Sequence, residues 1–510
     1  MNRKENGFTL IELLAVIVIL SIVALIATPI VLDVISNAKA KADLASSYGI
    51  IDTAKLYYIE SKFKDEEVPN TNILDTLTLG GEKAQIGEVY VNKKGEIAVA
   101  LKYGNKCHKK EFSEENIATS EYTVETCIVN DVPETNEPNI PNLHANMIPI
   151  KYDGTKWVKA DVTNLNKEWF NYDSQKWANA VTVTSATRET YKSAAIGTPV
   201  LESDILTYMV WIPRYEYKIE GAFGKNGIDA NNPGEIEVNF VSGTAATSGY
   251  RVHPGFTFGS EELTGFWVGK FEVTGTITNI TVKPNMVSLR NQSVSSFFSA
   301  MRNLDNNATY GYGNVEARMI KNSEWGAVAY LSQSKYGKYG NASYTGVNKE
   351  VYQNQSSAYI TGNSNGTPGQ TATNTQCPYS DHTNNCGIGA STTGTIYGVY
   401  DMSGGAHEYV MGNYNNTIES SGFGSLPETK YYDVYTTTNS ATACLGAVCY
   451  GHALSETVGW YGDYTYFVSS TYPWMLRGGY YNNDDFAGVF SFLISYGDTR
   501  TDSSSRLAHK

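Results

Sequence analysis

The hydrophobic pattern of the chain begins with a long apolar run and then changes period. Residues 8–32 are almost all apolar, and a helix of this length would extend about 37 Å, enough to cross a bilayer. Apolar residues then recur at intervals of three and four as far as about Phe63. The pattern predicts one long helix over about residues 8–63, apolar on all sides at first and amphipathic afterwards.

Two residues interrupt the apolar part of this helix. Glu12 places a carboxylate at membrane depth, where a charge costs roughly 2.5–3.5 kcal/mol. Pro29 removes a backbone hydrogen bond and is expected to kink the helix. The basic leader MNRKENG ends at Gly7, directly before the apolar run, and no small-x-small cleavage site follows that run. This arrangement differs from that of an ordinary secretory signal.

The positions of Gly7, Phe8, Glu12 and Pro29 resemble the N-terminal region of type IV pilins and pseudopilins. The resemblance implies that a membrane prepilin peptidase cleaves after Gly7 and that the new N-terminal residue, Phe8, is N-methylated. It also implies that Glu12 acts in assembly by neutralising the Phe8 amine of a neighbouring subunit, because two opposite charges are buried together more easily than either alone. The alternative is a plain membrane anchor that contains one acid.

A small β module and a linker are predicted after the long helix. The stretch GEVYVNKKGEIAVALKYG is typical of two strands joined by a Lys-Lys-Gly turn. Residues 131–146 then place Pro133, Pro138 and Pro141 among acids and asparagines with no apolar period, which predicts a semi-rigid extended linker.

The tryptophans all follow this linker, beginning with Trp157, Trp169 and Trp177 in residues 147–200. Alternating apolar positions there predict a small β unit of two or three strands. Its aromatic residues are interpreted as its own core, with a sugar-binding platform as the alternative.

From residue 201 the chain is rich in Gly, Asn, Ser and Tyr, with many short strands. Helical spacing indicates helices in 285–304, with Met286, Leu289, Phe297 and Met301, and in 316–335, with Trp325, Val328 and Leu331. A chain of 510 residues is too long for one core and is expected to form two or three domains. The predicted fold class is therefore α+β and multidomain.

Five stretches of this region, in order, resemble the formylglycine-generating enzyme (sulfatase-modifying factor) family, which has a C-type-lectin-like fold. They are MVWIPRYEY at 209, FWVGKFEVTG at 266, IKNSEWGAVAYL at 320, YGVYDMSGGAHEYV at 397 and LRGGYYNNDDFAGVF at 476. In the oxidase members a cysteine pair follows the Arg-Gly-Gly motif, whereas no cysteine follows Gly479 here. We therefore expect the fold without the enzyme activity.

Two further positions depart from that family's pattern. Gly405 and His407 replace its usual Asn and Trp, so any role tied to those residues is not carried over. His407 beside Glu408 suggests a metal site, but no second ligand falls at helical spacing, and a structural pair is preferred. No metal and no cofactor are expected.

The last segment combines regularly placed small and apolar residues with chemically mixed ones, and this split resembles the variable proteins of diversity-generating retroelements. The framework positions are Gly478, Gly479, Ala487, Gly488, Val489, Phe490, Phe492 and Leu507. The expected ligand-binding positions are Tyr480, Tyr481, Asn482, Asn483, Asp484, Asp485, Phe486, Leu493, Ile494, Ser495, Tyr496, Asp498, Arg500, Asp502, Ser503 and Ser504. Rigid aromatics among short polar residues suit a binding surface. The alternative is a polar surface tail without a ligand.

Charge and cysteine content narrow the function further. A net charge of −13 argues against a nucleic-acid-binding surface. The six cysteines form three local pairs, Cys107 with Cys127, Cys377 with Cys386 and Cys444 with Cys449, which in an exported protein indicates disulfides. Free buried thiols are the alternative, whereas the spacing does not suit zinc.

The expected organisation is a leader at 1–7, a pilin-like module at 8–130, a linker at 131–146, a Trp-rich β segment at 147–200 and a lectin-like domain at 201–510. The function predicted is a minor or tip pilin-like subunit, held in the cytoplasmic membrane before assembly and then displayed on the cell surface. Its expected partners are other pilin subunits, the prepilin peptidase, the pilus assembly machinery and a protein or glycan ligand. The alternatives are a surface-anchored enzyme of the formylglycine-generating type and a membrane-tethered binding protein that does not assemble.

Overall fold

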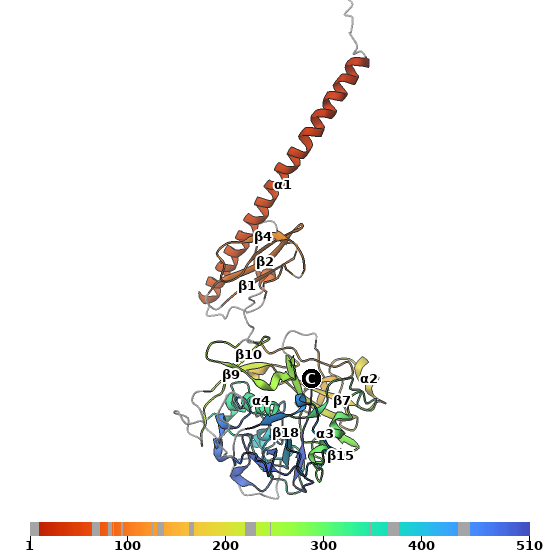
Figure 1. The fold of residues 1–510 in the computed structure, drawn as a ribbon, viewed down its shortest axis with the longest axis vertical. Coiled ribbons are helices and arrows are strands. Elements are labelled where there is room, and N and C mark those ends of the chain that lie inside the picture. Colours follow the sequence, from red (N-terminus) through yellow and green to blue (C-terminus); the bar gives the residue numbers. More distant parts are fainter. Residues whose placement is uncertain are drawn as a thin grey trace, which may run out of the picture. The chain divides into compact units, whose positions relative to one another are not determined.

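The computed structural model of the chain divides into two compact units, Met1–Thr135 and Asn136–Lys510, drawn as ribbons in Figure 1. The described residues are 10–63, 72–79, 84, 86–92, 95–124, 126–129, 137–162, 168–219, 231–244, 246–345, 349–365, 377–436 and 449–510. Each unit has a hydrophobic core of its own. The α+β multidomain organisation predicted from the sequence is therefore confirmed.

The first unit begins with helix α1 (Leu10–Phe63), which contains Pro29. Among the described helices, α1 is the one long and apolar enough to cross a membrane. Its described side chains over residues 10–35 are exposed, whereas Ile50, Ile51 and Ala54 are buried. The predicted change from an all-apolar to an amphipathic helix is confirmed, and the helix ends at Phe63 as predicted.

Four antiparallel strands cover the C-terminal half of α1 in the order β1-β2-β3-β4. They are β1 (Ile86–Val91), β2 (Ile97–Tyr103), β3 (Lys106–Lys110) and β4 (Ala118–Glu121). The predicted hairpin corresponds to β1 and β2, which pair from Ile86 with Lys102 to Val91 with Ile97. Apolar side chains of these strands pack on α1 through Val89, Val99 and Leu101.

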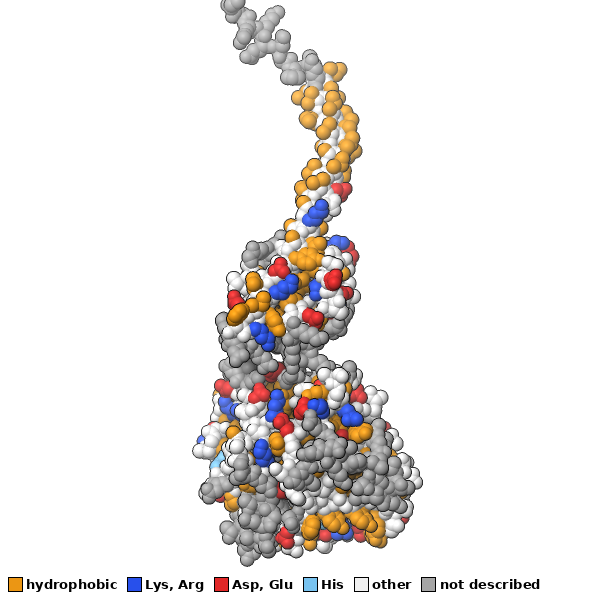
Figure 2. Space-filling model, turned by 90° about the vertical axis from the view of Figure 1, so that its left-hand side faces the viewer, with side chains coloured by type: hydrophobic (Ala, Val, Ile, Leu, Met, Phe, Trp, Pro, Cys, Tyr) orange, Lys and Arg blue, Asp and Glu red, His pale blue; other side chains and the backbone are white. Residues whose placement is uncertain are grey.

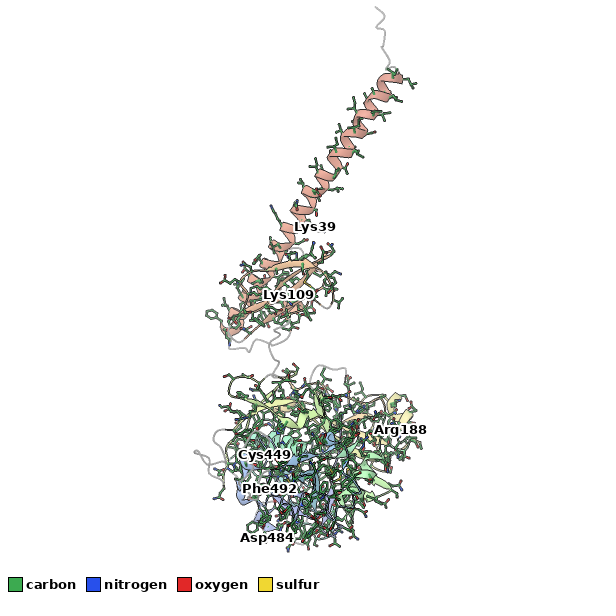
Figure 3. The ribbon with its side chains drawn as sticks, in the orientation of Figure 1. Lys39, Lys109, Arg188, Cys449, Asp484 and Phe492 are labelled. Carbon is green, nitrogen blue, oxygen red and sulfur yellow. A yellow bond between two sulfur atoms is a disulfide. The ribbon has the colours of Figure 1, made fainter. Side chains whose placement is uncertain are left out.

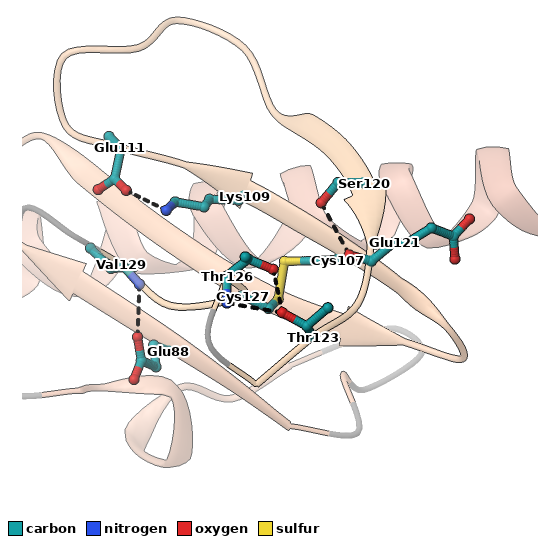
Figure 4. Close-up of a disulfide and its surroundings, with 10 residues drawn as sticks. All are labelled: Glu88, Cys107, Lys109, Glu111, Ser120, Glu121, Thr123, Thr126, Cys127 and Val129. Carbon is teal, nitrogen blue, oxygen red and sulfur yellow. Dashed lines mark hydrogen bonds and ion pairs between the residues drawn. A yellow bond between two sulfur atoms is a disulfide. The ribbon is translucent and has the colours of Figure 1, made fainter.

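The end of this unit is held by two links to the sheet, which Figure 4 shows in close-up. Cys107 of β3 forms the predicted disulfide with Cys127. The backbone N–H of Val129 also donates a hydrogen bond of 2.9 Å to the Glu88 carboxylate on β1. The segment after β4 is therefore fixed to both β3 and β1.

The second unit contains a seven-stranded antiparallel sheet in the order β17-β23-β14-β8-β7-β5-β6. Its strands are β17 (Arg318–Met319), β23 (Leu507–His509), β14 (Gly265–Gly269), β8 (Ile205–Pro213), β7 (Asn179–Val183), β5 (Ile148–Tyr152) and β6 (Trp157–Lys159). The last strand of the chain thus lies inside the sheet, between β17 and β14.

Residues 147–200 are not a separate unit, contrary to the expected boundary at residue 200. They supply the two or three strands that were predicted, but β7 pairs along its length with β8, from Asn179 with Val210 to Val183 with Ile205. Trp157 and Trp169 are buried in the same core as Trp267. The boundary fails because the apolar residues of this segment complete a larger sheet and not a core of their own.

A second, five-stranded sheet has the order β19-β18-β20-β21, with β22 pairing in parallel with β18. Its strands are β18 (His407–Tyr414), β19 (Asp433–Tyr435), β20 (Trp474–Arg477), β21 (Phe492–Ser495) and β22 (Ser503–Ser505). Shorter strands form three small sheets: β10 (Glu237–Phe240), β9 (Tyr215–Lys218) and β11 (Arg251–Val252); β12 (Thr257–Phe258) and β13 (Glu261–Glu262); β15 (Thr274–Thr276) and β16 (Asn279–Thr281).

Three short helices accompany these sheets: α2 (Arg188–Ser193), α3 (Val294–Arg302) and α4 (Asn322–Ser332). The two that were predicted are shorter than expected. Asn291 has a left-handed backbone, φ +66°, and the Ser293 side chain caps α3 by accepting from the Ser296 N–H, so the preceding residues are not helical. Helix α4 starts late because Glu324 accepts from the backbone N–H of Lys321 and β17 precedes it.

The predicted linker lies partly outside the described residues, but its second half packs on the second unit. The indole N–H groups of Trp211 and Trp267 donate to the carbonyls of Asn139 and Asn142 at 3.1 and 2.7 Å. His144 Nε2 lies 2.6 Å from the Lys510 carbonyl. Residues 137–146 therefore belong to the second unit, because they satisfy indole donors of its core.

Candidate functional site

The predicted processing and assembly residues lie at the start of the chain. Gly7 and Phe8 are outside the described residues, and Glu12 lies on α1 with a side chain that is also outside them. Pro29 is within α1. The site that the structure describes in detail is the C-terminal segment.

This segment leaves β20, forms two loops around β21 and returns through β22 and β23. Of its predicted ligand-binding residues, Asn482, Phe486 and Tyr496 are exposed, and the Asp485 side chain is outside the described residues. Half-buried residues make up most of the rest: Tyr480, Tyr481, Asn483, Asp484, Leu493, Ile494, Asp498, Arg500 and Asp502. The structure therefore brings twelve described residues of the predicted set to the surface (three exposed and nine half-buried).

Three predicted contact residues are buried, and here the prediction was wrong. Ser503 and Ser504 belong to β22, which pairs inside the sheet with His407 and Glu408 of β18. Ser495 ends β21, and its hydroxyl lies 2.8 Å from the Tyr409 hydroxyl. Serine is mostly exposed and common in turns, so the residue type pointed to the surface and did not indicate a packed strand.

The predicted framework residues are all buried, and two glycines show why they must be small. Gly479 has φ +70°, and a Cβ there would lie 2.6 Å from the Ala487 Cβ. A Cβ on Gly488 would lie 2.0 Å from Asp463 Oδ1, closer than atoms can approach. Side chains are therefore excluded at Gly479 and Gly488, on either side of the loop over residues 480–487, and this restricts the path of its backbone.

Asp463 holds the turn after this loop from beneath. Its Oδ2 accepts a 2.9 Å hydrogen bond from the Phe490 N–H. Burial raises the pKa of Asp463 to about 8, against the hydrogen bonds from Phe490 and Ser491, which favour the charged form. The Trp325 indole adds a 2.8 Å bond to the Val489 carbonyl. The backbone of the framework residues Val489 and Phe490 is thus held by Trp325 and Asp463, which lie outside this segment.

Arg477 fixes the other side of the turn. Its buried guanidinium donates to the Ser491 carbonyl at 3.1 Å, to Asn322 Oδ1 at 2.7 Å and to the His452 carbonyl at 2.6 Å. Five donors in a planar fork allow one side chain to join several segments. The arginine of the Arg-Gly-Gly motif is therefore structural in this chain.

His407 and Glu408, the predicted structural pair, have different partners because they are adjacent on strand β18 and point to opposite faces. Glu408 forms a buried ion pair with Arg506, whose Nε donates at 2.9 Å. His407 lies beneath the loop, with its ring 5.0 Å from that of Tyr480. Burial lowers the His407 pKa to about 4, so the ring is neutral at physiological pH. Among the described residues no three His, Cys, Asp or Glu side chains are grouped as metal ligands.

Aromatic residues outside the segment contact its exposed rings, and the sequence did not indicate them. Tyr464 meets Phe486 at 6.3 Å between ring centroids, Tyr472 meets Tyr496 at 4.4 Å, and Tyr359 meets Tyr481 at 5.0 Å. The clustering of aromatics in WYGDYTYFVSSTYPW at 460–474 was a usable signal, but spacing alone could not place it beside the C-terminal loops.

The charged side chains of this face are mostly acidic. Arg500 binds Asp502 through two bonds of 3.0 and 2.9 Å. The Arg290 guanidinium lies 3.7 Å from the centre of the Tyr359 ring and donates to the Thr501 carbonyl. The half-buried Asp484 and Asp498 each have one buried carboxylate oxygen without a hydrogen-bond partner among the described residues. The arrangement offers aromatic rings and carboxylates, which suits binding.

Residues 2–28 match the model of a protein family described as the prokaryotic N-terminal methylation motif. The chain thus carries the prepilin-type motif that the N-terminal residues predicted. A comparison of the whole sequence with curated proteins found no match.

Solved structures similar to this chain include variable protein 1 of Treponema denticola, at 12% identity and TM-score 0.25, covering 61% of this chain and 97% of that one. The U1 variant of the Major Tropism Determinant matches at 12% identity and TM-score 0.23, covering 85% and 96%. The I1 variant of the Major Tropism Determinant matches at 10% identity and TM-score 0.22, and the match covers 85% of this chain and 89% of that one. Similarity at these scores supports no argument about fold or ligand.

Proposed function

We propose that this chain is a type IV pilin-like surface subunit that displays a C-terminal binding domain for adhesion or receptor binding. The observation that carries the proposal is the methylation motif at residues 2–28, continuous with the exposed apolar part of α1. A helix with bare aliphatic side chains on all sides needs a bilayer or neighbouring helices around it. A pilin-like subunit would have the bilayer around this helix before assembly and the helices of neighbouring subunits around it after assembly.

The same proposal covers processing and partners. A prepilin peptidase would remove residues 1–7, and the pilus assembly machinery would stack the subunit with other pilins. The second unit, Asn136–Lys510, is much larger than the first. A head of this size on every subunit would crowd a filament, so the chain is proposed to be a minor or tip subunit.

Binding is assigned to the face formed by the C-terminal loops, by analogy with other rigid scaffolds that carry variable contact residues. Buried groups hold the loop bases, whereas Asn482, Phe486 and Tyr496 reach solvent. This separation would let the contact residues change without loss of the fold. We propose that the segment is diversified at those positions, and a near-copy of its coding DNA that differs at adenines, beside a reverse-transcriptase gene, is the expected sign.

The described cysteines do not favour the alternative of an oxidase. Cys107 with Cys127 and Cys377 with Cys386 form disulfides, and Cys449 is also disulfide-bonded, while Cys444 is outside the described residues. A redox enzyme needs a reactive thiolate at its site. Alkylation of the native protein with a thiol reagent is expected to label no cysteine, and labelling of Cys444 or Cys449 would favour the enzyme.

The decisive test of the proposal is the N-terminus of the mature protein. Mass spectrometry of protein purified from its host is expected to show a chain that starts at Phe8 with one added methyl group. A chain that starts at Met1 would exclude processing as a prepilin and leave a membrane-tethered binding protein.

A further inference from the structure

A row of tyrosines outside the C-terminal segment extends its exposed face. We call Tyr359, Tyr464, Tyr466 and Tyr472 the tyrosine rim. Three of them contact aromatic rings of the loops, as described above, and Tyr464 and Tyr466 are themselves 43% and 51% exposed. The rings that they contact are comparably open, with Phe486 at 53% and Tyr496 at 37%. The aromatic surface therefore continues beyond the segment.

Backbone hydrogen bonds hold this part of the rim rigidly. The Phe492 N–H donates to the Tyr464 carbonyl at 2.9 Å, and the Tyr466 N–H donates to the Phe492 carbonyl at 2.8 Å. The Tyr464 N–H donates to the Phe486 carbonyl at 3.0 Å. Residues 464–466 thus pair with the start of β21 through one parallel bridge between Thr465 and Phe492. A ring presented by a backbone held in this way loses little entropy on binding.

Tyr359 is held by its own backbone and by an arginine. Its backbone is left-handed, with φ +56°, and the Arg290 guanidinium covers one side of its ring. The Tyr359 ring also contacts the ring of Tyr481. The rim therefore borders the loops on two sides with residues that do not belong to them.

The charge of the face selects among ligand classes. Asp484, Asp498 and Glu419 form no ion pair within 4 Å with a described lysine or arginine, although Asp498 interacts electrostatically with Arg500. Glu419 and Asp498 also interact electrostatically with the Tyr496 hydroxyl. The two arginines of the face are already engaged, Arg500 by Asp502 and Arg290 by Tyr359. Figure 2 shows hydrophobic and acidic side chains together at the lower end of this unit, the end at which Figure 3 places Asp484.

We propose that the tyrosine rim and the C-terminal loops together bind a protein surface rich in lysine and arginine. Aromatic faces attract cations, and carboxylates pair with them, so one ligand chemistry satisfies both parts of the face. A second copy of this face would meet it with like charges, and a neutral glycan would leave the carboxylates unpaired. The inference rests on the proposed function and names the partner chemistry of the same site.

The test pans a phage-displayed library of random twelve-residue peptides on the full-length protein in a neutral detergent. Enriched peptides are then measured against Tyr464→Ala, Tyr466→Ala and Asp498→Asn variants. We expect the peptides to carry net positive charge and to bind each variant at least about tenfold more weakly, the size of effect typical of aromatic and charged hot-spot residues. Raising the salt concentration is expected to weaken binding further.

Matched controls lie on the surface near α2, away from Asp484 in Figure 3. Ile196→Ala removes an apolar side chain that is 55% exposed, and Glu189→Gln removes an acid of α2. Neither should change peptide binding by more than about twofold. Unchanged tryptophan fluorescence of each variant shows that it is folded.

Several results would overturn the inference. Neutral or acidic enriched peptides, equal binding to the rim variants, or no enrichment at all would each exclude a cationic partner at this face. If the original chain bound a glycan on an array and the rim variants did not, the partner would be a glycan and not a cationic protein surface. All of these results leave the N-terminal processing test untouched, so the proposed function stands or fails separately.

Discussion

At the scale of single residues, three acids of the second unit are buried close to one another and to one arginine. Glu272, Asp401 and Glu408 are all buried, and Arg506 is the base that pairs with one of them, Glu408. Burial, together with the neighbouring carboxylates, raises the pKa of Glu272 well above its usual range, and burial raises that of Asp401. The folded protein therefore holds protons here that the unfolded chain would release.

This retention sets the sign of a pH dependence. A carboxyl whose pKa is raised by folding contributes stability at low pH that is lost as pH rises above its unfolded value, by up to about 1.4 kcal/mol per pH unit and proton. Buried His253 and His509, whose pKa values burial lowers, act in the opposite direction below about pH 6.5. Buried Lys270 and Lys338, whose pKa values burial lowers well below their usual range, also act in the opposite direction at neutral and alkaline pH. The effect of one acid is therefore isolated by substitution.

Glu272→Gln is expected to reduce this loss. The amide can still accept from the Ala406 N–H, which lies 2.8 Å from Glu272 Oε1, and can donate to Ser288. We expect equal unfolding free energies at pH 5 and a more stable variant at pH 9, by about 1 kcal/mol or more. Tryptophan fluorescence during urea unfolding reports on this unit, because all eight tryptophans follow residue 156.

The comparison of the two proteins isolates Glu272, since the buried histidines are the same in both. A variant that is less stable than the original chain at pH 9 would mean that Glu272 is charged and supported in the folded state. Ser288→Ala serves as a control, because it removes the hydroxyl partner without changing the charge.

At the scale of elements, the loops of the binding face depend on what lies beneath them. The turn over residues 487–491 is held by Asp463, Trp325 and Arg477, which all lie outside it. The two ends of the loop before it meet at Gly479 and Ala487. Sequence variation is therefore possible between these fixed points and costly at them.

Gly488→Ala tests this dependence. Its Cβ would lie 2.0 and 2.3 Å from the two carboxylate oxygens of the buried Asp463, so the turn must shift. We expect a loss of about 1–3 kcal/mol in unfolding free energy, as for other overpacked sites. Gly424→Ala is the matched control, because a Cβ there meets no atom within 4 Å.

Equal stability of the Gly488 and Gly424 variants would contradict a fixed turn. Peptide binding to the Gly488 variant should weaken together with its stability, because Phe486 and Tyr496 flank the same turn. Both measurements are made on the full-length protein.

At the scale of the whole molecule, one chain joins a membrane and assembly element to a binding unit. The described side chains in the first half of helix α1 are exposed, whereas the second half packs on β1 and β2. The acid at position 12 falls in this first half, where a charge is tolerated if a neighbouring subunit supplies an opposite one.

Glu12→Ala separates assembly from membrane insertion. Removing the acid is expected to leave insertion intact, or improve it, and to lower incorporation into filaments by at least about tenfold. Fractionation of sheared filaments from membranes, with immunodetection of the chain in each, measures both. Glu60→Ala, a change at an exposed position in the second half of α1, should alter neither. Full incorporation of the Glu12 variant would contradict the assigned role.

The sequence by itself determined the features that depend on local pattern. The apolar period and its change predicted α1 to Phe63, the alternation around the Lys-Lys-Gly turn predicted β1 and β2, and the short spacing of cysteines predicted the Cys107–Cys127 and Cys377–Cys386 disulfides. The small residues of the final segment predicted its buried framework. Each of these follows from neighbours within about thirty residues, where periodicity and turn chemistry act directly.

Tertiary structure alone decided how distant segments combine. It joined residues 147–200 to β8, buried Ser503 and Ser504 in a parallel pairing with β18, and placed Tyr359 and Tyr464 beside the C-terminal loops. No local pattern marks these contacts, because a strand looks the same whichever strand it pairs with and a tyrosine looks the same in a core or on a binding face. Sheet order and long-range packing choose between those environments, and they are properties of the whole unit.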